Sequence, residues 1–246
     1  MSCLLKDMDL VDRCWDTYNE LIANSEPDRE YNKVKTWFKH EQDFASITLC
    51  GKTLVNASFM EVIAVFGEIG LIGSYIDFFE KLDIEKQFSN FRYMCQVNLK
   101  MPLFVKARDL IVMGLGITLS EEKTVILAMR SIIDEEFLGA KVPKESADYI
   151  RIVLNFGFYL ITYVDDNHTE LSLGLNVDPK VSVVPWFILN SFLKEVAYYI
   201  VNGFKDKIEK IDKTEYKKRR ELRKEFYDKI SERLHFIPTN TTFLPD

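Results

Sequence analysis

Residues 100–114, KMPLFVKARDLIVMG, read as a buried β-strand that carries charged residues among its apolar ones. Successive residues of a strand face opposite sides, so Arg108 shares one face with Leu110 and Val112 whereas Asp109 lies on the other. A buried charge is costly unless it is paired. Arg108 and Asp109 cannot pair with each other across one side of the strand. One of the two must therefore meet a partner or line a wet hollow, and the structural alternative is an ion pair at the strand end that fixes the geometry of the sheet.

Composition indicates a globular chain. Its 246 residues suit one large domain or a domain with an appendage, and 47% of them are apolar while 28% are charged. The longest uncharged runs, 152–164 and 181–193, have 13 residues each, short of the roughly 20 that a membrane-spanning helix needs. The N-terminus has no secretory pattern, and the four cysteines show no CxxC spacing. These features predict a cytoplasmic protein with reduced thiols.

The hydrophobic period predicts the order of elements. An amphipathic helix over 8–24 comes first, and strands over 33–39 and 43–56 follow, the second containing a hairpin that turns at Gly51-Lys52. Two short helices, six strands and an apolar helix complete the order. The expected ranges are 58–66 and 71–82 for the short helices, 89–99, 103–114, 123–134, 149–155, 157–164 and 168–177 for the strands, and 185–204 for the last helix.

The connections between these strands are too short for crossover helices, which predicts a largely antiparallel sheet. A sheet of nine strands curls and buries one face. The long apolar helix that follows is suited to close that face. Such a fold either fills the hollow with side chains or leaves a cavity.

The C-terminal region differs in charge from the rest. Residues 1–203 hold 20 Lys and Arg against 29 Asp and Glu, whereas residues 204–246 hold 12 against 9. A charged helix is expected over 214–234, with Leu222, Phe226, Ile230 and Leu234 as a narrow stripe that docks on the body. We expect the basic cluster 217–224 to stay in solvent, or else to meet an anionic membrane; the overall acidity argues against nucleic acid.

Signals for catalysis or metal binding are scarce. The three histidines are isolated, no cysteine lies at metal-ligand spacing, and there is neither a GxSxG motif nor a P-loop. His168 beside Asp165 and Asp166 fits a polar hairpin turn. We therefore predict no catalytic residue, no metal and no cofactor.

Four short motifs occur in register along the chain: Pro102 with Arg108-Asp109, Tyr149-Ile-Arg151, Asn176-Val-Asp-Pro179, and Val184-Pro185 with Asn190. Together with the element order they resemble the START domains, the steroidogenic acute regulatory protein-related lipid transfer family, over about 7–210. The resemblance implies a helix-grip fold of the α+β class, in which a curved antiparallel sheet of nine strands wraps around a long C-terminal helix. It also implies a tunnel that holds one lipid.

The resemblance further implies which residues meet the lipid. Asp77, Arg108 and Arg130 are the polar candidates for a head group. The expected partner of Arg108 is a carboxylate, with Asp77 first, or else bound water or the lipid head group, while Asp109 is expected to face backbone donors. The apolar candidates for the lining are Val97, Leu110, Val112, Met129 and Leu173, with Trp186, Leu189 and Leu193 from the closing helix. The Arg that sterol binders carry falls on Gly114, so the lipid class stays open.

We therefore predict a START-like lipid-binding domain over 1–210 and a basic helical extension over 211–246 packed on it. The expected function is non-enzymatic binding and transfer of one phospholipid, sphingolipid or sterol, with transient contact at a membrane surface and no nucleic acid partner. Two alternatives remain. One is a helix-grip enzyme of the cyclase or hydrolase type, which needs a His or a carboxylate pair in the hollow; the other is an interaction domain with a packed core.

Overall fold

The computed structural model describes residues 3–40, 46–73, 76–77, 79–101, 105–180, 186–211 and 213–234. Within these ranges, the side chains of residues 3, 186–194, 213–215, 217, 220 and 231 lie outside the description. The motif residues Pro102, Val184 and Pro185 therefore fall outside it, as does the side chain of Asn190.

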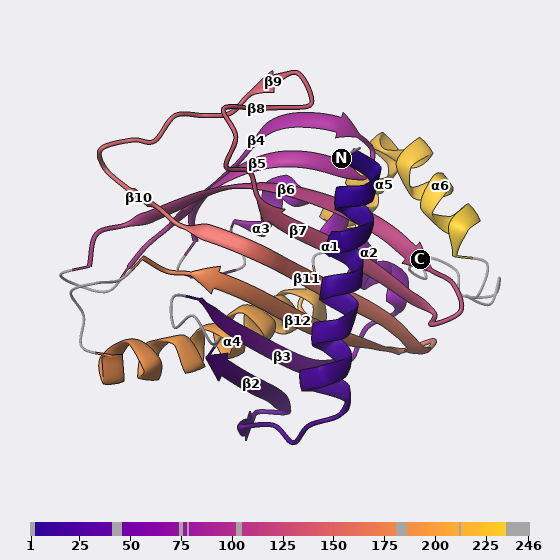
Figure 1. The fold of residues 1–246 in the computed structure, drawn as a ribbon. Coiled ribbons are helices and arrows are strands. Elements are labelled where there is room, and N and C mark those ends of the chain that lie inside the picture. Colours follow the sequence, from indigo (N-terminus) through magenta and orange to yellow (C-terminus); the bar gives the residue numbers. More distant parts are fainter. Residues whose placement is uncertain are drawn as a thin grey trace.

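One large sheet dominates the described part of the chain (Figure 1). Its strands are β1 (Arg29–Tyr31), β2 (Val34–His40), β3 (Ile47–Val55), β4 (Phe79–Ser89), β5 (Arg92–Leu99), β6 (Arg108–Leu119), β7 (Thr124–Ser131), β10 (Ile150–Arg151), β11 (Val153–Asp165) and β12 (His168–Asp178). Nine of them follow the order β1-β2-β3-β12-β11-β7-β6-β5-β4, all antiparallel, and β10 pairs with β6 in parallel. The predicted antiparallel sheet of nine strands is confirmed. A separate hairpin joins β8 (Glu136–Phe137) and β9 (Ala140–Lys141).

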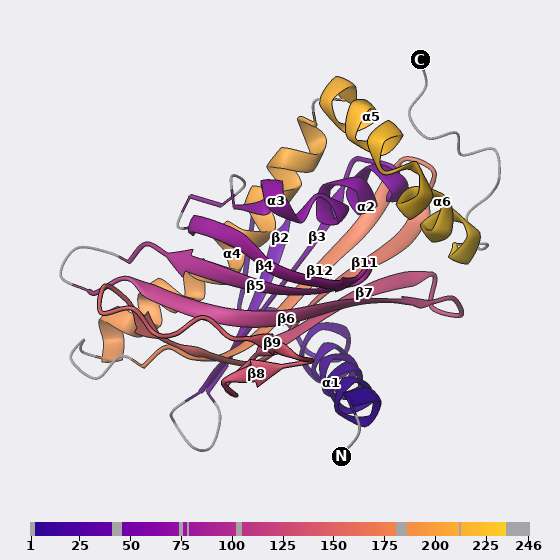
Figure 2. The same cartoon turned by 90° about the horizontal axis from the view of Figure 1, so that it is seen from above.

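Helices cover both faces of this sheet. They are α1 (Cys3–Thr17) with a π-helical last turn, η1 (Tyr18–Ala23), then α2 (Phe59–Gly67), α3 (Ile69–Ile72), α4 (Trp186–Glu209), α5 (Lys213–Leu222) and α6 (Lys224–Arg233). Figure 2 shows α1 on one face, called the outer face here, and the other helices on the inner face. None of the helices in the described ranges combines the length and apolarity that a membrane crossing needs.

The outer face is packed directly against α1. Leu10 and Cys14 of this helix are buried in a cluster with Ile111 and Met113 of β6. The thiol of Cys14 donates a hydrogen bond to the carbonyl oxygen of Gly157, 3.6 Å away. Burial raises the pKa of Cys14 to about 12, so the thiol stays protonated and packs as a small apolar group.

On the inner face, α2 is fixed by its own sequence. Ser58 and Glu61 form a capping box: the Ser58 hydroxyl accepts from the Glu61 backbone N–H, and the Glu61 carboxylate accepts from the Ser58 backbone N–H at 2.8 Å. Apart from Ala64, the apolar residues that follow the cap are buried against the sheet and α4: Phe59, Met60, Val62, Ile63, Val65 and Phe66. This helix therefore begins where the sequence predicts.

Two predicted elements are wrong. The range 71–82 is not a helix, because α3 ends at Ile72 and β4 begins at Phe79, where Phe79 and Leu82 pair with β5. A short apolar run fits either structure by its period, and here the pairing with β5 decided it. The prediction of a single helix over 214–234 is wrong too, because the structure has two helices there, α5 and α6, with Arg223 between them.

Other boundaries also differ. The strands expected over 149–155 and 157–164 are the short β10 and the continuous β11, and the strand expected to start at 103 starts at Arg108.

The predicted hairpin at Gly51-Lys52 is wrong as well. β3 runs straight through Gly51, which pairs with Thr36 of β2 and Leu173 of β12. A Cβ atom at Gly51 would lie 2.8 Å from Cγ2 of Val201 and 3.4 Å from the carbonyl oxygen of Ala197, both on α4. Glycine therefore marks the place where α4 approaches the backbone of the sheet, and not a turn.

We predict that Gly51→Val lowers the free energy of unfolding by about 1–3 kcal/mol, because the added side chain pushes α4 away from β3. Gly114→Val on β6 is the matched control, since a Cβ atom there meets nothing within 4 Å. Urea denaturation of both variants checks this. Equal stability of the two would show that α4 does not press on Gly51.

Candidate functional site

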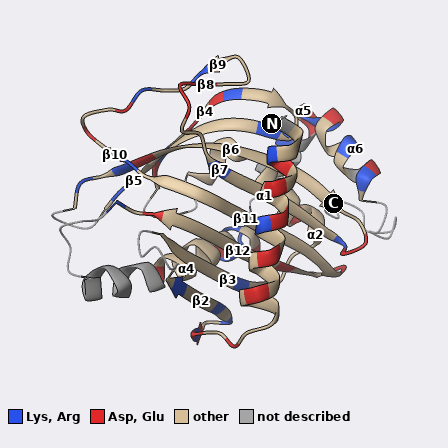
Figure 3. Cartoon of the chain, in the orientation of Figure 1, with Lys and Arg blue, Asp and Glu red and all other residues tan. Residues whose placement is uncertain are grey.

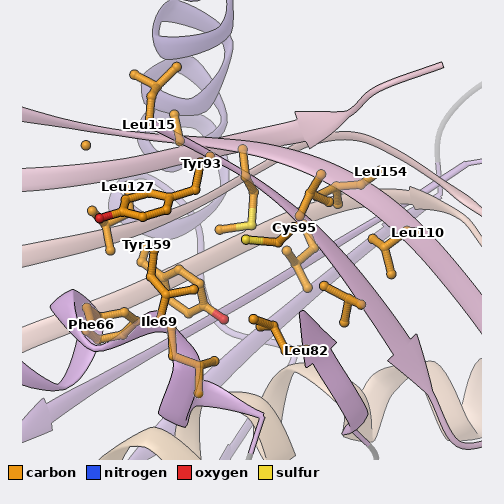
Figure 4. A pocket seen from close by; sticks show the side chains of 18 of the residues that line it. Phe66, Ile69, Leu82, Tyr93, Cys95, Leu110, Leu115, Leu127, Leu154 and Tyr159 are labelled. Carbon is orange, nitrogen blue, oxygen red and sulfur yellow. The ribbon is translucent and has the colours of Figure 1, made fainter. Parts of the chain in front are cut away.

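An apolar cavity of about 330 Å³ lies between the inner face of the sheet and the helices. It follows β6 from Arg108 to Thr118, and its walls include the neighbouring strands β5 and β7 and residues of α2, α3 and α6. Figure 4 shows its side chains converging from opposite walls, with Leu110 and Leu154 toward one end and Leu115 and Leu127 toward the other.

Four of the predicted lining residues are in its wall: Val97, Leu110, Val112 and Met129. They come from β5, β6 and β7, and inward-facing residues on adjacent strands share one surface. Cys95 also lines the cavity, and burial, with a smaller effect of Glu85, raises the pKa of its thiol to about 12. The thiol is therefore neutral and adds to the apolar surface.

The other predicted residues lie elsewhere. Asp77 is exposed and Arg130 is on the outer face, where its guanidinium stands over the Phe137 ring and donates to the Ser131 carbonyl oxygen at 3.2 Å. Neither lines the cavity in the described structure, and Leu173 is fully buried in the core beside it. The side chains of Trp186, Leu189 and Leu193 lie outside the described ones.

Arg108 reaches the cavity wall but not Asp77. Its side chain is buried, and its guanidinium donates to the carbonyl oxygens of Pro179 at 3.4 Å, of Lys180 at 3.3 Å, and of Lys106. The expected Asp77 partner is thus wrong, because backbone carbonyls of the turn after β12 satisfy the guanidinium. Burial lowers the pKa of Arg108, yet arginine keeps its charge in proteins.

Asp109, on the opposite face, meets a guanidinium and not the expected backbone donors. The Arg151 Nη2 lies 2.5 Å from the Asp109 Oδ2, and the Gln96 side-chain amide donates to the same oxygen at 3.3 Å. Asp109 is 1% exposed, and Arg151 also donates to the carbonyl oxygen of Pro143 at 2.6 Å. This buried pair fastens β10 alongside β6.

The C-terminal helices close one end of the cavity. Phe226, Ile230 and Arg233 of α6 are among the lining residues, and the Phe226 ring packs 5.4 Å from the Phe91 ring. Phe226, Ile230 and Leu234 are buried as the stripe predicts, whereas Leu222 is 85% exposed. The extension is thus part of the cavity wall.

A buried carboxylate holds this extension in place. Glu68, between α2 and α3, lies 3.0 Å from Nη1 of Arg223 and 3.4 Å from Nη1 of Arg219, and it accepts from the Tyr227 hydroxyl at 3.0 Å. Burial first, and then the Glu68 charge, raise the pKa of Tyr227, which therefore stays a neutral donor. The expectation that the basic cluster stays in solvent is wrong for Arg219 and Arg223.

Glu68 and the cavity residue Tyr159 were not singled out from the sequence. Tyr159 had a detectable signal, since it is a hydroxyl-bearing residue at an inward position of an apolar strand. Glu68 had none, because its partners lie about 150 residues away along the chain. Among the described residues, no three His, Cys, Asp or Glu side chains gather as metal ligands would.

Solved structures match this architecture. Human STARD10 aligns with a TM-score of 0.69 and 15% identity, over 86% of this chain and 82% of its own. Human StAR-related lipid transfer protein 5 aligns with a TM-score of 0.69 and 14% identity, over 84% of this chain and 96% of its own. The chain has the START fold.

More distant structures agree. A STAR-related lipid transfer protein from Xanthomonas axonopodis aligns with a TM-score of 0.61 and 10% identity, over 73% of this chain and 96% of its own. No protein-family model matches the sequence, and no curated protein matches it either. The START fold predicted from the four motifs is confirmed, and at these identities the likeness concerns the fold alone.

We predict that Asp109→Asn lowers the free energy of unfolding by about 3–5 kcal/mol, because it leaves the Arg151 charge buried without a counter-charge. The control is Lys39→Ala, which breaks the exposed pair of Lys39 and Glu20 and should cost less than about 1 kcal/mol. Chemical denaturation measures both. A loss in Asp109→Asn no larger than in the control would contradict this role.

We also predict that Glu68→Ala releases the C-terminal helices, because Arg219, Arg223 and the Tyr227 hydroxyl lose their common acceptor. Amide hydrogen exchange over 224–233 should speed up by about 100-fold, the factor that corresponds to the roughly 3 kcal/mol lost with a buried ion pair. Exchange in β6 should stay slow. Asp228→Ala, which breaks only an exposed pair with Lys224, is the control; similar exchange in both variants would refute the anchoring role.

Proposed function

We propose that this chain binds one lipid in the cavity and transfers lipid between membranes without catalysing a reaction. The observation that carries the proposal is the apolar cavity between the sheet and the inner helices. Burial of an acyl chain contributes about 0.8 kcal/mol per CH₂ group, so such a wall can draw a lipid out of a bilayer. The alternative, an interaction domain with a packed core, does not account for this cavity.

The lining also favours binding over the enzyme alternative. The titratable groups that line its described part belong to cysteine, tyrosine, lysine and arginine, for example Cys95, Tyr159 and Arg108. A cyclase or hydrolase mechanism calls for a His or a carboxylate there.

The size of the cavity bears on the ligand. Ligand pockets commonly measure about 300–1,000 Å³, and this one lies at the low end. A compact lipid fits the volume best, and the choice among sterol, sphingolipid and phospholipid remains a prediction.

We propose that α4 closes the cavity and that the corner between α5 and α6 touches the membrane. Leu222 is 85% exposed there, beside the exposed Lys218 and Lys224. Basic and acidic residues alternate along α6 (Figure 3). An exposed leucine among lysines suits the interface of an anionic bilayer, and the cytoplasmic location stays a prediction.

Gly114→Phe tests the lipid proposal. Gly114 lines the cavity, and a Cβ atom there meets nothing within 4 Å, so a phenyl ring fills the space that the lipid needs. We expect the fold to persist and the lipid detected by native mass spectrometry to fall several-fold. Gly114→Ala, which adds one methyl group, should keep its lipid. Full occupancy in a folded Gly114→Phe protein would overturn the proposal.

A further inference from the structure

Tyr159 places a hydroxyl group inside the apolar cavity. It lies on β11 between Leu127 of β7 and Leu173 of β12, in the middle of the sheet, and only 9% of the residue is exposed. Its ring is in the cavity wall, and Figure 4 shows its oxygen directed into the cavity.

Two aromatic neighbours hold this ring in place. The Phe66 ring of α2 packs 4.9 Å from it in a tilted arrangement, and the Phe204 ring of α4 packs 5.2 Å from it edge-on. Phe66 and Phe204 are themselves stacked at 4.5 Å. A ring enclosed in this way cannot turn its hydroxyl out to solvent, so the oxygen has a defined position.

No residue in the described part of the chain forms a hydrogen bond with the Tyr159 hydroxyl. Two other partly or fully buried tyrosines show the usual arrangement: Tyr227 donates to Glu68 at 3.0 Å, and Tyr163 donates to Asp166 at 3.0 Å. Burial raises the pKa of Tyr159, so its hydroxyl is neutral and able both to donate and to accept. The hydroxyl opens into the cavity, so a molecule bound there can supply the partner that enclosed polar groups usually have.

We propose that the Tyr159 hydroxyl is the hydrogen-bonding anchor of the ligand, and that the ligand is a neutral lipid with a hydroxyl or carbonyl oxygen in its buried part. This inference rests on the proposed lipid-binding function and adds the chemistry that selects the lipid.

The surroundings of Tyr159 exclude a charged group at this position. Leu127 pairs with it on β7, and Leu82 and Cys95 also belong to the cavity wall, so a charge in this apolar part would be desolvated without a counter-ion. Arg108 is the first residue of β6 and pairs with Leu99 at the end of β5, whereas Tyr159 lies in the middle of the sheet. Tyr93, Lys100 and Arg233 also line the cavity, but a ligand that bonds to Tyr159 is favoured over an analogue that lacks the matching oxygen, because that analogue leaves this hydroxyl unpaired.

Tyr159→Phe removes the oxygen and keeps the ring packing. The experiment uses the delipidated chain of residues 1–246 with Nile red in the cavity, displaced by 1-dodecanol or by dodecane. We expect Tyr159→Phe to weaken the binding of 1-dodecanol by about tenfold, the effect of one hydrogen bond, and to leave dodecane binding within about twofold. The melting temperature should stay equal or rise. Tyr163→Phe, on the same strand with its hydroxyl bonded to Asp166, should change neither affinity.

Two results would overturn the inference. Equal loss of 1-dodecanol and dodecane would assign Tyr159 to packing alone, and no loss of either would show that its hydroxyl is satisfied without the ligand, for example by a trapped water. Failure of the proposed function looks different. In that case, Nile red and both probes fail to bind the wild-type protein, or Gly114→Phe leaves their binding unchanged.

Discussion

Strand β6 is buried on both faces, and much of the structure follows from this. Its outward residues Ile111 and Met113 lie under α1, and its inward residues face the cavity, so the adjacent charges at its start are both removed from water. Arg108 is satisfied by carbonyl oxygens of the turn after β12, and Asp109 by Arg151 of β10. Because each charge needs its own partner, the start of β6 holds two segments: Asp109 holds β10, and Arg108 holds the turn at 179–180 that leads toward α4.

The cavity exists because the inner helices approach the sheet only at certain strands. On β3, the absence of a side chain at Gly51 brings α4 against the backbone. On β6, a Cβ atom at Gly114 would meet nothing within 4 Å, so the missing side chain there leaves open space. The same residue type thus permits close packing at one position and preserves volume at the other, and the difference lies in what stands opposite.

The C-terminal helices form part of the cavity wall and are held there by one buried carboxylate. Glu68 binds Arg219, Arg223 and Tyr227, and this network holds Phe226 and Ile230 of α6 in the cavity wall. A boundary between a lipid-binding domain over 1–210 and an extension over 211–246 remains a prediction. The cavity wall includes residues from both parts, so movement of α6 would change the cavity itself.

The sequence by itself determined the elements whose signals are local. The alternation in β6, the capping box of α2 and the amphipathic stripe of α1 each depend on residues close in the chain, and four motifs in register were sufficient to predict the START fold. Four lining residues on β5, β6 and β7 were predicted from the resemblance to START domains, and strand alternation places them on one face. Tertiary structure decided the rest. It made Gly51 a packing site, Phe79 the start of a strand and Glu68 the anchor of α6, and it replaced Asp77 with backbone carbonyls as the partner of Arg108. Each of these depends on a partner far away along the chain, whose position is set only when the sheet has formed and its neighbours compete for the same buried space.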